Sequence, residues 1–128
     1  MLAPVIPGLN DAEVEALLAA ARDAGAVAAS YVVLRLPGEV AGLFREWLAE
    51  AYPDRAAKVM KRVRTLHGGR DYGATWGRRM TGIGVEAELI ARRFALASAR
   101  LGFARSLPPL DAGRFRAPVP VGGQLALF

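Results

Sequence analysis

The 128-residue chain contains no cysteine, and this absence excludes several kinds of site. No disulfide can form within it, and it cannot by itself hold a thiolate zinc site or a cysteine-ligated iron–sulfur cluster. Histidine is almost as scarce, since His67 is the one copy, so a site with two histidine ligands is also excluded. We expect His67 to lie at a helix end before a Gly-Gly pair, where a positive charge is favourable.

Long apolar runs are also missing, although 53% of the residues are hydrophobic. The apolar runs present are far too short to cross a bilayer, and no basic-then-apolar signal peptide opens the chain. We therefore expect one small domain with its own core, in the cytoplasm and without a membrane partner.

Lysine is rare among the seventeen basic residues, and the charge is unevenly distributed. Residues 1–53 carry three basic against seven acidic residues, a balance of −4, whereas residues 54–128 carry fourteen against five, a balance of +9. A basic half of this kind predicts an anionic partner, and nucleic acid is the commonest one. The alternative is compositional, because a GC-rich genome enriches arginine and alanine without any such partner.

Hydrophobic periodicity predicts a βαβ unit followed by helices. The first strand is expected at 2–6, and a helix ending near Gly25 follows, with Asn10 and Glu13 as a capping-box-like start. The nearly all-apolar segment 27–36 is typical of a parallel strand covered on both faces. Three further helices are expected at 40–51, about 56–66 and about 85–101, with a glycine-rich loop at 67–84.

Two strands are few for a parallel sheet, and the chain begins inside the first of them. Sheet edges left unpaired on both sides would invite association with other chains. We therefore expect this chain to be the end of a larger α/β protein.

Several motifs along the chain are similar to those of one enzyme family. They are APVIPGLND at 3–11, YVVLRLP at 31–37, LFREWL at 43–48, PDR at 53–55, GG at 68–69, GRRM at 77–80 and ELI at 88–90. Together they resemble the C-terminal portion of radical SAM proteins, in the DNA-repair-photolyase-like branch related to spore photoproduct lyase. The resemblance implies an α/β fold: the last two strands of a partial (β/α)6 barrel with their helices in 1–53, a helical extension in 54–104 and a flexible tail in 105–128.

The resemblance also implies a share in a cofactor site. Radical SAM barrels hold the adenine of S-adenosylmethionine with an Ile-x-Gly-x-x-Glu-like turn after the fifth strand, and residues 6–11 match it with Asp in place of Glu. The implied contacts are Ile6, Pro7, Gly8, Asn10 and Asp11, with Gly8 allowing close approach of the backbone. An ordinary turn with a helix N-cap accounts for the same residues, so both interpretations stay open.

Arg35, near the end of the second strand, is the sixth candidate for the cofactor site. A charged residue at the strand end where α/β barrels place ligands suggests contact with a carboxylate or a phosphate. The alternative is a salt bridge to Asp11 or Glu39.

One departure from the family decides what this chain can do alone. The Cx3Cx2C triad that holds the 4Fe–4S cluster is absent. The resemblance implies S-adenosylmethionine and this cluster as cofactors of the intact protein, neither of them held by this chain alone, and an N-terminal radical SAM half as a partner. The intact enzyme would cleave S-adenosylmethionine reductively, and the resulting radical would attack a substrate. The family resemblance, together with the C-terminal peptide described below, suggests damaged nucleic acid as that substrate. The competing hypothesis is a non-catalytic adaptor on DNA.

Two basic segments are candidates for nucleic-acid contact, one on a helix and one in the glycine-rich loop. Their residues are Lys58, Lys61, Arg62, Arg70, Arg78 and Arg79. The loop interleaves arginines with Tyr72 and Trp76, a mixture that suits phosphate contact and base stacking. The alternatives are a solvated helix face and a lid over the barrel mouth anchored by the two aromatic residues.

The last five residues, QLALF, resemble the peptide with which bacterial proteins bind the DNA sliding clamp. Gln124 would form hydrogen bonds at a pocket rim, while Leu125, Leu127 and Phe128 would enter an apolar groove. The preceding segment 115–123 is rich in proline and then glycine, which indicates a tether. The alternative is a hydrophobic C-terminus that folds back onto its own domain.

Overall fold

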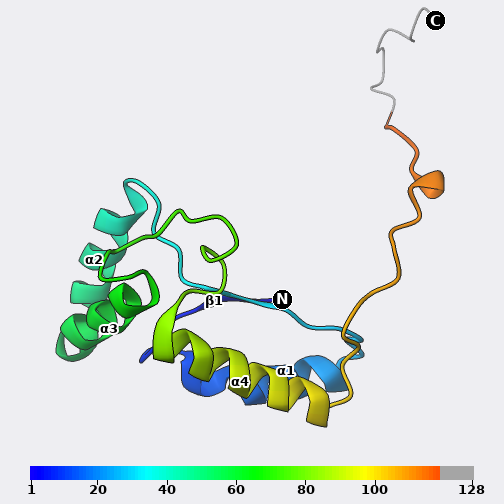
Figure 1. The fold of residues 1–128 in the computed structure, drawn as a ribbon, viewed down its shortest axis with the longest axis horizontal. Helices are drawn as coiled ribbons and strands as arrows, with labels where there is room; N and C mark the ends of the chain where they lie inside the picture. The colour runs from blue at the N-terminus through cyan, green and yellow to red at the C-terminus, as the bar shows by residue number, and fades with distance from the viewer. Residues whose placement is uncertain (119–128) are drawn as a thin grey trace, which may run out of the picture.

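The computed structural model describes residues 1–118, which form four α-helices and a two-stranded parallel sheet (Figure 1). The βαβ unit consists of β1 (Leu2–Val5), the 3-10 turn η1 (Asp11–Glu13), α1 (Val14–Asp23) and β2 (Tyr31–Val33). It is followed by α2 (Val40–Ala51), α3 (Pro53–Leu66), α4 (Gly84–Arg100) and the 3-10 turn η2 (Ala112–Arg114). The predicted order of elements is confirmed.

The second strand is shorter than the predicted segment 27–36. Val27 is 58% exposed, and Ala28 forms only an isolated parallel bridge with Ala104. Just beyond β2, the Leu34 amide still donates a hydrogen bond to the Val5 carbonyl at 3.0 Å. The strand ends early because β1 offers only four residues for pairing.

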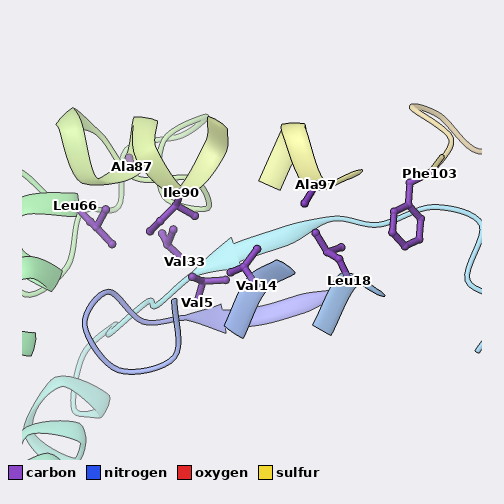
Figure 2. Packing of buried hydrophobic residues seen from close by; sticks show 9 residues of the cluster. All are labelled: Val5, Val14, Leu18, Val33, Leu66, Ala87, Ile90, Ala97 and Phe103. Atoms are coloured by element: carbon purple, nitrogen blue, oxygen red, sulfur yellow. The ribbon is translucent and has the colours of Figure 1, made fainter. Parts of the chain in front are cut away.

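The core has two parts. In the first, Val5 and Val33 of the sheet pack against Val14 and Leu18 of α1 and against Ile90 and Ala97 of α4 (Figure 2). The second part lies beyond the carboxyl ends of the strands, where α2 and α3 pack together. Its buried residues are Ile6, Leu34, Leu36, Leu48, Val59, Met60 and Val63.

Within residues 1–118, helices cover one face of the sheet. α1 packs against α4, and both lie on the same side of the strands (Figure 1). Tyr31 and Val33 point into this side, so Val32 between them points to the opposite face, where it is only half-buried. The expectation of helices on both faces is therefore wrong for the described part of the chain.

The two edges of the sheet differ. The outer side of β2 and the segment before it receive main-chain contacts from later parts of the chain. The Val33 amide of β2 donates to the Met80 carbonyl, and the Ala104 amide donates to the carbonyl of Val27, upstream of β2, both at 2.9 Å. No described residue pairs with the outer edge of β1. A groove of about 370 Å³ runs beside β1, and Leu17 of α1, which is 48% exposed, forms part of its wall.

Residues 105–118, which include η2, are exposed and run away from the helices (Figure 1). The clamp-binding-like residues Gln124, Leu125, Leu127 and Phe128 lie outside the described residues. In residues 1–118, no helix has the length and the hydropathy that crossing a bilayer requires.

Candidate functional site

The turn after β1 closes on itself through two polar side chains. Asn10 Oδ1 accepts a hydrogen bond from the Ile6 amide at 2.7 Å, and Asn10 Nδ2 donates to the Pro4 carbonyl at 3.0 Å. Asp11 Oδ1 accepts from the Gly8 amide at 2.8 Å. The Asn10 side chain thus reaches back to the strand and forms no cap on the following helix, so the capping-box prediction is wrong.

Arg62 connects this turn to α4. Its Nη2 lies 3.2 Å from Asp11 Oδ2, and its Nε and Nη2 donate to the two carboxylate oxygens of Glu86 at 2.8 and 2.7 Å. The hydrogen bonds from Arg62 lower the pKa of Glu86, and the same bonds raise the pKa of Arg62. Arg62 was predicted to contact nucleic acid. In the structure its Nε and Nη2 instead donate hydrogen bonds to two carboxylates of the same chain, Asp11 and Glu86.

Gly8 lies directly against this guanidinium. It has a φ of +81°, and a Cβ at this position would lie 3.0 Å from Arg62 Nη1. A side chain at residue 8 would therefore be strained by its backbone conformation and crowded by Arg62.

Few polar side-chain groups of this turn are free to contact S-adenosylmethionine. Ile6 and Pro7 are buried, and the side-chain oxygens of Asn10 and Asp11 already accept hydrogen bonds within the chain. Asn10 and Asp11 thus have a structural role in the turn, and contact of residues 6–11 with the cofactor stays a prediction.

Of the six candidates only Asp11 and Arg35 are charged; Asp11 pairs with Arg62, whereas Arg35 forms no ion pair with any described residue. Its Nη2 donates to the Tyr72 hydroxyl at 3.3 Å, its Nη1 lies 3.6 Å from Met80 Sδ, and its buried Nε has no partner there. The predicted alternative of a salt bridge to Asp11 or Glu39 is wrong, since neither carboxylate pairs with it. Arg35 therefore keeps a charge that suits an anion.

The start of the glycine-rich loop is anchored to Leu34, the residue directly after β2. His67 is buried, and its Nε2 donates to the Leu34 carbonyl at 2.9 Å, which requires the proton on Nε2. The Tyr72 ring packs edge-on against His67 with 5.9 Å between ring centroids. Tyr72 thus packs against the domain, which the lid interpretation expects of both aromatic residues. Trp76 is 82% exposed and does not attach the loop to the rest of the domain.

The basic candidates fall into two groups. Lys58, Lys61, Arg70 and Arg78 are exposed and form no ion pair with any described residue. Arg62 is paired as above, and Arg79 is half-buried with its guanidinium 4.8 Å from the centre of the Trp76 ring.

Sequence reasoning missed the ion pairs that join distant elements. Asp71 accepts hydrogen bonds from Arg45 of α2 at 2.8 Å and from Arg64 of α3 at 2.6 Å, which ties the loop to both helices. Periodicity within a helix gives no signal for such partners, because they are brought together only by the packing of the helices.

Comparisons with protein-family models, with curated proteins and with solved structures find no match to this chain. The radical SAM resemblance is therefore carried by the sequence motifs alone and stays a prediction.

Proposed function

We propose that this chain forms the last two β/α units and the C-terminal extension of a radical SAM barrel and has no catalytic activity alone. The observation that supports this proposal is a parallel sheet left open at one edge. In residues 1–118, β1 has no neighbour on its outer side, and α1 and α4 cover only one face. In a barrel, the outer face carries the helices, the inner face lines the interior, and each strand pairs on both sides.

The groove beside β1 supports the same proposal. It is bounded by β1 and by apolar side chains of α1, including Val14 and the half-exposed Leu17. A preceding β/α unit would cover these side chains and pair with the open edge of β1. The edge would then no longer be available for unwanted pairing with other chains.

Arg35 is the residue of this chain that we assign to cofactor contact. It lies just beyond the carboxyl end of β2, where α/β barrels place their ligands, and its charge suits the carboxylate of S-adenosylmethionine. When bound, that cofactor would supply a radical through reductive cleavage at a 4Fe–4S cluster, which cysteines of another segment would have to hold. The turn at 6–11 would supply shape and a fixed helix start.

The test is co-expression with a segment that carries Cx3Cx2C and the first four barrel strands. We expect a complex that produces 5′-deoxyadenosine, and we expect Arg35→Ala to weaken S-adenosylmethionine binding about tenfold, as loss of a charge-assisted contact would. Arg92→Ala is the matched control, because Arg92 is exposed and has no described ion pair. A complex that binds the cofactor equally well with Arg35→Ala would refute the assignment.

The second candidate function is a non-catalytic, DNA-associated adaptor that the QLALF peptide recruits to the sliding clamp. Its support is the set of four exposed basic residues without described ion pairs, Lys58, Lys61, Arg70 and Arg78. Both functions place the protein in the cytoplasm, where the bacterial chromosome and its clamp lie. DNA affinity of the chain alone tests this candidate: it should fall steeply as salt rises, and a flat dependence would contradict phosphate contact.

A further inference from the structure

We propose that Trp76, with Arg78 and Arg79, forms a binding site for an unpaired nucleotide of a single-stranded nucleic acid. This inference rests on the proposed association with nucleic acid and specifies which form is bound. It also assigns a role to the exposed tryptophan that neither the fold nor the barrel proposal explains.

The exposure of Trp76 is the first observation. The chain has one other tryptophan, Trp47, whose ring lies 5.6 Å from each of the Phe44 and Tyr52 rings, measured between centroids. Trp76 is 82% exposed, and the Arg79 guanidinium lies 4.8 Å from the centre of its ring. Much of the indole surface is therefore available for stacking, and the cation reinforces the binding of a polarisable ring.

The second observation is that the loop around Trp76 forms hydrogen-bonded turns and is attached to β2 and α3 on its C-terminal side. The amides of Arg78 and Arg79 donate to the Thr75 carbonyl at 3.1 and 3.0 Å, and the Gly82 amide donates to the Arg78 carbonyl at 2.8 Å. The Met80 carbonyl accepts from β2, and the Ile83 amide donates to the Leu66 carbonyl of α3 at 3.0 Å. A ring presented by a fixed loop loses less conformational entropy when it binds.

Charge complementarity is the third observation. Arg70 and Arg78 are exposed without described ion pairs, and the nearby Asp71 is already shared by two arginines. Arg78 also lines a groove of about 400 Å³, but Glu88 lines the same groove. We therefore expect phosphates on the exposed side of the arginines and not inside the groove.

The nucleic acid must be unpaired at this site. In a duplex both faces of each base are already stacked on neighbouring pairs, so an indole cannot stack without breaking that contact. In a single strand the base faces are free, and stacking on an aromatic side chain tolerates any base. DNA and RNA share this chemistry.

The first experiment observes the ring itself. In the full chain with Trp47→Phe, Trp76 is the one tryptophan, so emission reports on it alone. We expect (dT)10 or (rU)10 to quench this emission, and comparison of the two oligonucleotides distinguishes DNA from RNA. A decamer of abasic deoxyribose phosphate, which has the same charge but no bases, should leave the emission unchanged.

The second experiment separates stacking from charge. Trp76→Ala should weaken binding of labelled (dT)10 about fivefold or more, while duplex affinity stays unchanged, and Trp76→Phe should restore most of the loss. The exposed position of Trp76 predicts that these variants fold normally, which circular dichroism checks.

The outcomes distinguish this inference from the proposal on which it rests. One outcome overturns the stacking site only: the chain binds duplex normally, Trp76→Ala does not change its affinity for (dT)10, and neither oligonucleotide changes the Trp76 emission. The proposed association with nucleic acid is then retained. Absence of binding to any nucleic acid at low salt overturns both. An emission change with vesicles of anionic phospholipid, and none with oligonucleotides, assigns the loop to a membrane surface and overturns the inference.

Discussion

The guanidinium of Arg93 on α4 donates two hydrogen bonds to the carboxylate of Glu15 on α1, at 2.8 and 2.5 Å. The two residues are 78 positions apart in the sequence, so the pair joins the first helix to the last. It holds α1 and α4 side by side on one face of the sheet. Neither of these two helices covers the other face of the strands.

This pair predicts how stability depends on pH. The hydrogen bonds from Arg93 lower the pKa of Glu15 below its ordinary value of 4.5, and Arg62 does the same for Glu86. Because the folded-state pKa is depressed, the stabilisation is complete above the unfolded value and is lost as pH falls through the folded value. The free energy of unfolding, measured with urea between pH 7 and pH 3, should fall below about pH 4.5. Glu15→Gln should make this fall shallower, and an unchanged slope would contradict the assignment.

Two adjacent leucines on α1 should respond very differently to truncation. Leu18 is fully buried between the sheet and α4, whereas Leu17 is 48% exposed. Leu18→Ala should destabilise the chain by about 2–5 kcal/mol, because it opens a cavity in the core. Leu17→Ala should cost less than about 1 kcal/mol. Urea titration followed by circular dichroism measures both, and similar losses for the two variants would place the core elsewhere.

Gly8 should be less replaceable than another glycine with positive φ. Gly8→Ala adds a Cβ that lies 3.0 Å from Arg62 Nη1 at a φ of +81°, whereas Gly25, with a φ of +93°, has nothing within 4 Å of such a Cβ. Backbone strain alone should cost about 1 kcal/mol at Gly25, and Gly8→Ala should cost roughly twice that. Thermal unfolding compares the two variants, and equal shifts in melting temperature would show that Arg62 moves aside freely.

The C-terminal peptide gives a prediction that does not depend on the fold. The full chain should retain the sliding clamp in a pull-down, and the double variant Leu127→Ala, Phe128→Ala should lose it, because two apolar anchors are removed. A matched control is Leu107→Ala with Leu110→Ala, two exposed leucines upstream of the peptide. Equal retention by the wild-type chain and the Leu127/Phe128 variant would exclude clamp docking through this peptide.

Local patterns predicted the elements of this fold better than they predicted its side-chain roles. Apolar spacing located all four helices of residues 1–118, although α3 begins at Pro53 and not near residue 56. The predicted β2 is too long, because the number of residues that can pair depends on the length of its partner β1, which the apolar pattern of β2 does not show. The contacts of polar residues were harder to predict. The sequence places Arg62 on the exposed face of a helix, but packing of the helices brings its guanidinium against Asp11 and Glu86.

Copurification of this chain with a cluster-binding radical SAM segment tests the barrel proposal most directly. The measurement compares Leu17→Glu, in the groove beside β1, with Leu43→Glu on α2, which is 61% exposed and outside that groove. Both variants should fold as the wild-type chain does. We predict that Leu17→Glu abolishes copurification and that Leu43→Glu leaves it intact. Copurification that survives Leu17→Glu, or that never occurs with the wild-type chain, would contradict the proposed barrel.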